Sequence, residues 1–195
     1  YDANGSLTSD GSNTYAYDYE NRLISATKAG TTATYKYDAF GRRVRKDDGG
    51  GTLTNFIYDG DQLIAEYDGA GTLINKFVYG AGIDEIISLT KGSNTYYYHY
   101  DGLGSVTNLT DSSSATVESY EYDVFGKPNI VSSIGNRFLF TGREYDSETG
   151  LYYYRARYYS PTIGRFLQRD PVGYTAGINL YSYCSNNPVN WIDPF

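Results

Sequence analysis

The stretch YKYDAFGRRVRK, residues 35–46, decides the fold of this chain. It begins as an alternating run with two tyrosines, passes through a turn that contains Gly41, and continues as a second run, RRVRK. Alternate side chains of a β-strand share one face, and glycine and aspartate supply the conformations that tight turns require. The stretch therefore predicts one β-hairpin.

The hairpin pattern recurs along the chain at a nearly even spacing. Tyr-Asp marks six of these units, and Tyr79-Gly80 fills the gap between the third and fourth of them. The tyrosines are Tyr17, Tyr37, Tyr58, Tyr79, Tyr100, Tyr122 and Tyr145, at steps of 20, 21, 21, 21, 22 and 23 residues. A lone hairpin is only marginally stable in water, so we expect the units to pair side by side in one long sheet. In the first unit, alternation would place Tyr15, Tyr17 and Tyr19 on one face.

The composition agrees with an all-β fold of repeated antiparallel hairpins. The 195 residues include 24 tyrosines and 22 glycines but no methionine. Tyrosine fits a pleated, half-buried surface, and glycine with asparagine and aspartate supplies turns. We expect helix in well under a fifth of the residues, with one short helix near Asn179–Ser185, before Pro188.

Charge and rare residues exclude several function classes. The net charge of −7 argues against nucleic-acid binding, which normally needs a basic face. Cys184 is the only cysteine and His99 the only histidine, so no intrachain disulfide and no cysteine or histidine metal cluster is expected, and no cofactor. His99 lies in the strand-like run TYYYHYDG, where a packing role is more natural than catalysis. No apolar run approaches the about 20 residues of a membrane helix.

Weaker candidates are interpreted as turns. The run GAGIDE, residues 80–85, has the glycines of a phosphate loop but lacks the lysine and a following helix, which favours a hairpin turn. Asp59, Asp61 and Asp68 lack the spacing of a calcium loop and are interpreted as solvated turn residues.

Several segments carry a resemblance to a known family. YDAFGRRVRK, YDGLGSVTNLTD and YDVFGKP resemble the YD repeats of the Rhs (rearrangement hot spot) family, which includes the C components of bacterial Tc toxins and, more distantly, the teneurins. Residues 137–195, from RFLFTGREYD to NPVNWIDPF, resemble the Rhs-associated core domain. The resemblance implies that residues 1–136 form a spiralling β-strip, part of a hollow shell, and that residues 137–195 form an irregular plug.

The resemblance also implies a site. The family's core cuts its own chain once by an aspartyl-protease-like reaction, and the matching residues are Arg157, Asp170 in RDPVG and Asp193 in WIDPF. The cut would follow directly after Phe195, where this chain ends, although the glycine of a second Asp-Pro-x-Gly is not present. Two close carboxylates share a proton, and an arginine can hold one through a bidentate contact. We expect the two carboxylates within direct or one-water contact, with the Phe195 carboxylate nearby.

Other interpretations of the same residues stay open. Asp170 and Asp193 could simply open type I turns, with each carboxylate accepting backbone amides. The chain would then be a non-enzymatic structural or adhesive β-repeat protein, a fibre or surface scaffold, with sugar binding on exposed tyrosines as one option. A tyrosine ladder that packs across strands is the favoured alternative to sugar binding.

The resemblance implies partners and a location. It implies a C-terminal toxin domain in the parent chain, and further YD repeats or a neighbouring copy on the strip's N-terminal edge near Tyr1, where backbone groups would be unpaired. A bacterial, secreted or cell-surface location follows from the same resemblance.

Overall fold

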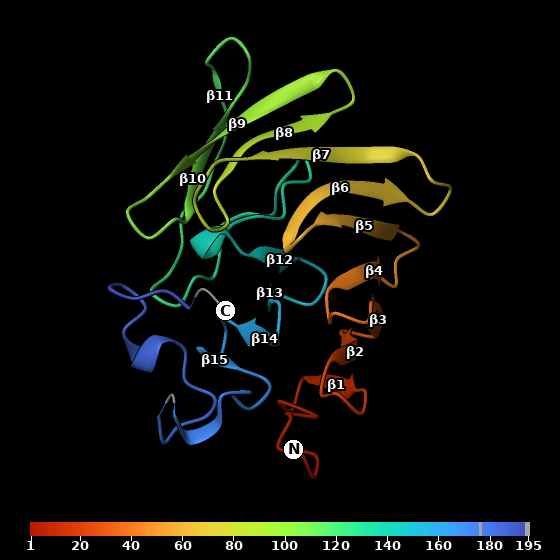
Figure 1. Ribbon diagram of the computed structural model, residues 1–195, viewed down its shortest axis with the longest axis vertical. Coiled ribbons are helices and arrows are strands. Elements are labelled where there is room, and N and C mark those ends of the chain that lie inside the picture. Colours follow the sequence, from red (N-terminus) through yellow and green to blue (C-terminus); the bar gives the residue numbers. More distant parts are fainter. Residues whose placement is uncertain (176, 194–195) are drawn as a thin grey trace.

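The computed structural model describes residues 1–175 and 177–193, and nearly all of its regular structure is antiparallel β (Figure 1). In these residues eleven strands form one sheet in chain order, each paired with its neighbours in sequence. They are β1 (Asn13–Tyr17), β2 (Leu23–Lys28), β3 (Thr31–Tyr37), β4 (Arg43–Asp47), β5 (Leu53–Asp59), β6 (Gln62–Asp68), β7 (Leu73–Tyr79), β8 (Ile86–Lys91), β9 (Asn94–Tyr100), β10 (Val106–Thr110) and β11 (Thr116–Ser119). We call this sheet the strip.

A second sheet lies against the strip. Within the described residues it has four strands, β12 (Glu144–Asp146), β13 (Leu151–Tyr154), β14 (Arg157–Ser160) and β15 (Arg165–Phe166). We call residues 137–175 and 177–193, which contain it, the C-terminal segment. The boundary expected at residue 136 stays a prediction; the two sheets are separated by the stretch between Ser119 and Glu144.

Helix is confined to single turns in the part of the chain that the structure describes. These 3₁₀ turns are η1 (Phe140–Gly142), η2 (Gly173–Thr175) and η3 (Cys184–Asn186). The expected all-β fold of antiparallel hairpins is confirmed, and the short helix expected near Asn179–Ser185 is only the 3₁₀ turn η3. None of the described helices has the length and apolar character to cross a bilayer.

The tyrosines that set the repeat form a ladder of hydrogen bonds. Each hydroxyl donates to a backbone carbonyl of the preceding unit, over 2.6–3.1 Å. The pairs are Tyr17 to Leu7, Tyr37 to Leu23, Tyr58 to Arg43, Tyr79 to Leu63, Tyr100 to Ile86 and Tyr122 to Val106. Burial raises the pKa of these phenols above their ordinary value, so the hydroxyls keep their protons and remain donors.

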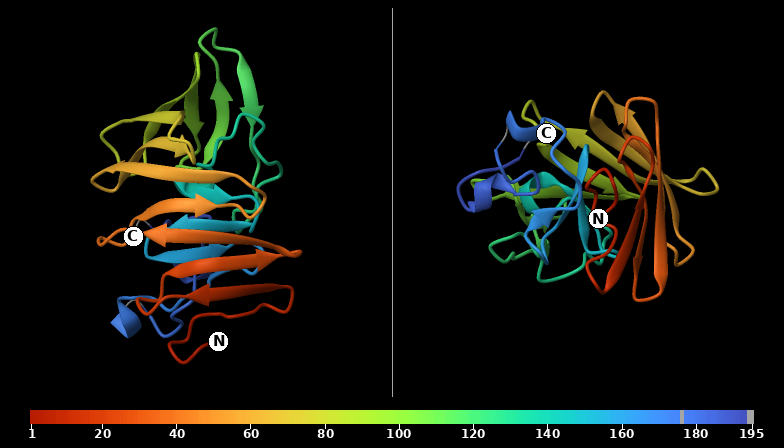
Figure 2. Two further views of the ribbon diagram at one scale, coloured as in Figure 1. Left: turned by 90° about the vertical axis from the view of Figure 1, so that its right-hand side faces the viewer. Right: turned by 90° about the horizontal axis from the view of Figure 1, so that it is seen from below.

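Aspartates close the recurring turn, and in four units the aspartate directly follows the repeat tyrosine. In the turn Asp38–Arg42, Oδ1 of Asp38 accepts the amides of Phe40 and Arg42 at 2.9 and 3.0 Å, and Gly41 has the positive φ of 80° that the turn requires. Asp18, Asp48, Asp68, Asp101, Asp111 and Asp123 accept amides at the same two positions. The strand register shifts next to Tyr17, Tyr37, Tyr58 and Tyr79, which marks a bulge in each unit. Such bulges increase twist, and the strip curves as Figure 2 shows.

Three details differ from the sequence-based expectations. Tyr15 and Tyr17 pack inward, but Tyr19 falls in the turn and is 87% exposed. Tyr145, counted as a seventh repeat, lies on β12 of the second sheet instead of in the strip. His99 does not pack inside: it is exposed on β9 and hydrogen-bonds Thr110.

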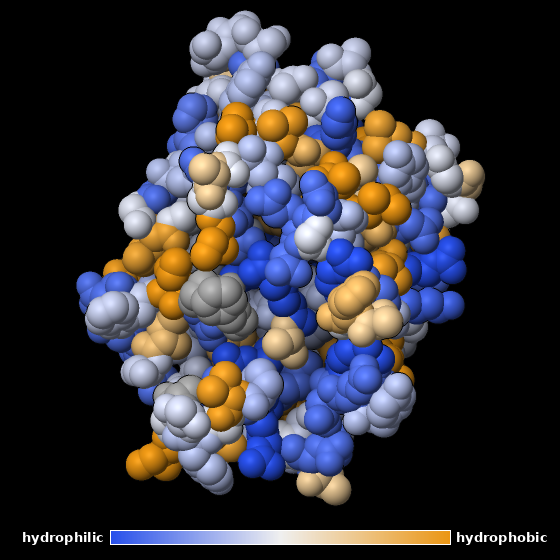
Figure 3. All heavy atoms as spheres, in the orientation of Figure 1, coloured by the Kyte–Doolittle hydropathy of each residue, from blue (hydrophilic) through white to orange (hydrophobic). Residues whose placement is uncertain are grey.

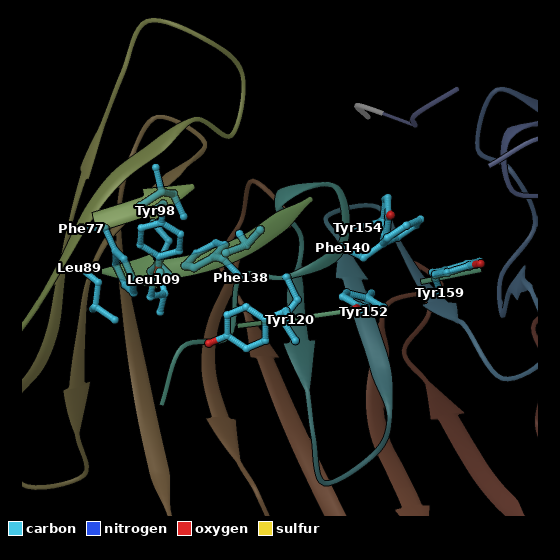
Figure 4. Packing of buried hydrophobic residues seen from close by; sticks show 14 of the residues in the cluster. Phe77, Leu89, Tyr98, Leu109, Tyr120, Phe138, Phe140, Tyr152, Tyr154 and Tyr159 are labelled. Atoms are coloured by element: carbon cyan, nitrogen blue, oxygen red, sulfur yellow. The ribbon is translucent and has the colours of Figure 1, made fainter. Parts of the chain in front are cut away.

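The curved strip lies along one side of the second sheet (Figure 2). Phe77, Tyr98 and Leu109 of the strip meet aromatic side chains of the C-terminal segment such as Phe138 and Tyr152 in one cluster (Figure 4). A smaller cluster joins strands β1–β3 to β13 and β14. On the face seen in Figure 3, hydrophilic residues gather between the two parts. The fold therefore depends on contact between segments far apart in sequence.

A buried cluster of charges also joins the two parts. Arg43 of β4 is 0% exposed and pairs with Glu144 at 2.7 Å and with Asp146. Lys46 binds Asp146 at 2.9 Å, and Arg137 pairs with Glu144 at 3.1 Å. Burial tends to raise the pKa of Asp146, but the neighbouring charges of Arg43, Lys46 and Arg137 outweigh it and hold that pKa well below its usual range.

The N-terminal edge of the strip is partly covered by the chain itself. The amide of Tyr15 donates to the carbonyl of Thr8 at 2.9 Å, and the amide of Leu7 donates to Leu167 of the C-terminal segment at 2.8 Å. The first strand begins at Asn13 rather than near Tyr1. That further repeats or a neighbouring copy extend this edge stays a prediction.

The tyrosine ladder can be tested with Tyr100→Phe. The change removes the hydroxyl that donates to Ile86 but keeps the ring, so we expect the free energy of unfolding to fall by about 1 kcal/mol. Tyr97→Phe, on the exposed face of the same strand, is the matched control and should change it by less than about 0.5 kcal/mol. Urea denaturation measures both, and equal effects would contradict a role for the ladder.

The charge cluster can be tested with Asp146→Asn. Removing one buried charge leaves Arg43 and Lys46 poorly compensated, and we expect a loss of about 3–5 kcal/mol at pH 7. The native pKa of Asp146 lies below the about 3.9 of an unfolded aspartate, so its contribution is present above about pH 4 and is lost as the pH falls below that. Denaturation of wild type and variant between pH 3 and pH 7 should show their difference shrinking in acid. Asp61→Asn, in an exposed turn, is the control.

Candidate functional site

The three residues implied by the resemblance come from three different places in the C-terminal segment. Arg157 is the first residue of β14, and Asp170 follows β15 in a turn. In this turn Oδ1 of Asp170 accepts the amide of Val172 at 2.9 Å, and its carbonyl accepts the amide of Gly173 at 3.0 Å. Asp193 is the last residue that the structure describes.

Arg157 brings the two aspartates together. Its Nη1 lies 2.9 Å from Oδ2 of Asp170, and its Nη2 donates to Oδ2 of Asp193 at 2.9 Å. The side chain of Arg157 is 5% exposed, against 15% for Asp170 and 20% for Asp193. The guanidinium carbon lies 3.7 Å from the centre of the Phe166 ring, which fixes the plane of the fork. One buried cation therefore bridges two carboxylates that are 23 residues apart.

A small cavity opens between the two aspartates. It has a volume of about 190 Å³ and is lined by Asp170, Asp193, Ser182 and Cys184, among others. The space is large enough for several water molecules, because each needs about 30 Å³. Burial raises the pKa of the Cys184 thiol to about 11, and the charge of Asp193 adds to this effect. At neutral pH this thiol is therefore not a nucleophile.

A second cavity lies on the other side of Asp193. Its volume is about 410 Å³, and its walls include Ile83, Tyr100 and Leu103 of the strip and Ile192 of the C-terminal segment. The strip thus supplies one wall of the space beside the aspartate, so the site is bounded by both parts of the molecule.

Sequence reasoning missed two residues at this site. Arg143 donates from Nη2 to the backbone carbonyl of Asp193 at 3.2 Å, and the same nitrogen lies 3.2 Å from Oδ2 of Asp84. Asp84 is in the loop that follows Tyr79-Gly80, the one point where the repeat lacks its aspartate. The missing aspartate marks this loop as different from the other turns in the sequence. Only the fold shows that the loop contacts Arg143.

The geometry is compatible with both interpretations of the aspartates, as turn residues and as a catalytic pair. Asp170 forms its turn through Oδ1, as a plain turn residue would, and contacts Arg157 through Oδ2. The catalytic roles stay predictions, and Phe195 with its carboxylate lies outside the described residues. Among the residues that the structure describes, no cluster of histidine, cysteine, aspartate and glutamate suits a metal ion.

Comparison with known sequences assigns the family. Residues 1–189 match the family described as Teneurin YD-shell. The chain belongs to the YD-shell family.

Two of its relatives are much longer proteins. The tRNA3(Ser)-specific nuclease WapA of Bacillus spizizenii is 41% identical over 206 residues, which cover 100% of this chain and 9% of WapA. The double-stranded DNA deaminase toxin A of Burkholderia cenocepacia is 31% identical over 116 residues, covering 56% of this chain and 8% of that toxin. This YD-shell chain thus spans about a tenth of the length of WapA.

Solved structures show the same fold. The crystal structure of TcdB2-TccC3 superposes with a TM-score of 0.78 at 23% identity, over 100% of this chain and 11% of that one. The Photorhabdus luminescens Tc holotoxin pore gives 0.76 at 21% identity, over 100% of this chain and 10% of that one. The YD-shell strip and its C-terminal segment therefore share their architecture with part of a Tc toxin.

The environment of Cys184 can be tested by alkylation. With a thiol pKa of about 11, the reaction with iodoacetamide at pH 8 should be roughly 100-fold slower than for a free cysteine. Unfolding in urea should restore the ordinary rate, which serves as the control. A native rate equal to that of free cysteine would mean that Cys184 is not half-buried beside Asp193 as described.

Proposed function

We propose that this chain is the end of a YD-repeat shell whose C-terminal segment cuts its own polypeptide once, directly after Phe195. The observation that carries the proposal is the Arg157 fork, which holds the carboxylates of Asp170 and Asp193 at one place. The match of these three residues to the self-cleaving Rhs core supports it. The chain would be a single-turnover, aspartyl-type autoprotease acting in cis.

The chemistry needs one proton shared by two carboxylates. With Arg157 offsetting one negative charge, the pair carries a second charge that a single proton can balance. The ionised carboxylate then takes a proton from water, whose oxygen attacks the carbonyl carbon of Phe195, while the protonated one donates to the carbonyl oxygen. Collapse of the intermediate breaks the C–N bond, and the proton passes to the leaving amine. The cavity of about 190 Å³ beside both aspartates gives room for the water.

The role of the strip is enclosure. WapA and the deaminase toxin are named for nuclease and deaminase activities, and this chain matches less than a tenth of either. A toxin domain downstream of residue 195 in the parent chain, held inside a shell made of further repeats and released by the cut, would account for that pattern. A secreted or cell-surface location belongs to the same proposal.

The second candidate function is a non-enzymatic scaffold. It is favoured by the amide that Asp170 accepts through Oδ1, because the same contact recurs in ordinary turns of the strip such as that of Asp38. In that case Arg157 would only neutralise two turn carboxylates. Loss of cleavage on changing Asp170 separates the two functions.

The test uses the chain extended by the residues that its gene encodes after Phe195. We expect the wild type to be cut after Phe195, as mass spectrometry of the two products would show. Asp170→Asn and Asp193→Asn each remove one ionisable group and should slow the cut by at least about 100-fold. The rate is followed by gel densitometry after synthesis in a cell-free system.

Asp123→Asn is the matched control. Asp123-Val-Phe-Gly126 forms the same kind of turn as Asp170-Pro-Val-Gly173, with amides accepted by the carboxylate, but it lies outside the Arg157 contact. It should therefore be cut at the wild-type rate. Cleavage of Asp170→Asn or Asp193→Asn at that same rate would eliminate the aspartyl mechanism and leave the scaffold function.

A further inference from the structure

The loop Gly80–Glu85 between β7 and β8 departs from the repeat. After Tyr17, Tyr37 and Tyr100 the next residue is an aspartate that accepts the turn amides. In this loop Glu85 accepts instead, taking the amide of Gly82 at 2.8 Å. The amide of Gly80 donates to the carbonyl of Glu85 at 2.8 Å, and a side chain at position 80 would run into the Glu85 carboxylate. Because Glu85 accepts the turn amide, the carboxylate of Asp84 takes no part in the turn and contacts other residues.

Asp84 reaches across to the C-terminal segment. Its Oδ2 lies 3.2 Å from Arg143 and its Oδ1 lies 2.5 Å from Arg155. The backbone of Asp84 has a φ of 57°, which is uncommon for a residue other than glycine. Gly142 approaches so closely that an added Cβ would lie 3.3 Å from the carbonyl oxygen of Asp84. The loop therefore packs closely against Gly142, which directly precedes Arg143.

Arg143 connects this loop to the proposed cleavage site. Its side chain is 5% exposed, its guanidinium carbon lies 5.0 Å from the centre of the Tyr154 ring, and it donates to the backbone carbonyl of Asp193. A cation this deeply buried needs a nearby counter-charge, and Asp84 supplies one from the strip. Asp193 is thus held twice, by Arg157 at its carboxylate and by Arg143 at its carbonyl.

We propose that Asp84 and Arg143 are positioning residues for the self-cleavage, so that the site is complete only when the strip has closed over the C-terminal segment. The chain leaves Asp193 through the carbonyl that Arg143 binds, and this contact sets the direction of the peptide that follows. A shift of about 1 Å at a reacting group can cost about 100-fold in rate. The inference rests on the proposed function and adds a condition to it: cutting waits for correct folding of the shell.

The experiment measures the cleavage rate of the same extended chain. Asp84→Asn and Arg143→Lys keep size and, for lysine, charge, and we expect each to slow the cut by about 10- to 100-fold. Arg143→Ala should be slower still and should recover at least tenfold when guanidinium chloride is added at tens of millimolar, because the free cation can occupy the vacated position. Recovery by the missing group is an effect that a merely structural side chain would not give.

Arg42→Ala is the matched control. Arg42 also pairs with an aspartate of the strip, Asp38, at 2.7 Å, but it does not contact Asp193. Its rate should equal that of the wild type, with and without guanidinium. Circular dichroism melting of every variant shows whether a slow rate comes from lost folding.

The outcomes separate the two proposals. Normal cleavage of Asp170→Asn would overturn the proposed function itself. Loss of cleavage in Asp170→Asn with wild-type rates in Asp84→Asn and Arg143→Ala would overturn only the positioning role. A folded Arg143→Ala that is slow and does not respond to guanidinium, with Arg143→Lys equally slow, would also overturn it.

Discussion

The hydrogen bond from each repeat tyrosine to the preceding unit is the constraint on which the structure depends. Leu23 pairs with Tyr17 at a bulge, and its carbonyl accepts the hydroxyl of Tyr37. Arg43 in turn pairs with Tyr37, and its carbonyl accepts the hydroxyl of Tyr58. Each bulge therefore provides the acceptor for the next tyrosine. Because each tyrosine bonds a carbonyl of the preceding unit, the spacing of 20–22 residues along the strip is consistent with this link.

The last Tyr-Asp pair lies in the second sheet, beyond the end of the tyrosine ladder. Tyr145-Asp146 has the sequence of a repeat, yet Asp146 does not cap a turn amide two residues on; it is fully buried between Arg43 and Lys46 of the strip. Removing one partner of a buried ion pair is strongly destabilising, whereas replacing the whole pair by apolar residues often costs little. The contribution of this cluster is therefore that arrangements which separate its charges are disfavoured. In this arrangement Asp146 of β12 contacts both cations of β4 at once. The cluster thus joins the C-terminal segment, which carries Arg157 and Asp170, to the strip.

Local sequence was enough to predict the strip but not the site. The alternation around Tyr37 and the glycine turn after it are short-range signals, and they predicted hairpins correctly because a bulged hairpin is itself a local structure. The outward position of Tyr19 was missed because the turn begins at Asp18, which ends the alternation. Asp84 and Arg143 were missed because their contact joins positions 59 residues apart, and no pattern within one unit reports on it. Arg157, Asp170 and Asp193 were named only through family resemblance.

The turn and the site use the same carboxylate chemistry. In the strip, Asp38 accepts amides through Oδ1 and binds the side chain of Arg42 through Oδ2. Asp170 divides its oxygens in the same way, with Val172 on one and Arg157 on the other. The difference is the identity of the arginine: Arg42 comes from its own turn, whereas Arg157 comes from another strand and also holds Asp193. The turn role of Asp170 and its proposed catalytic role are therefore compatible in geometry, because the turn holds one oxygen while the other contacts the shared cation.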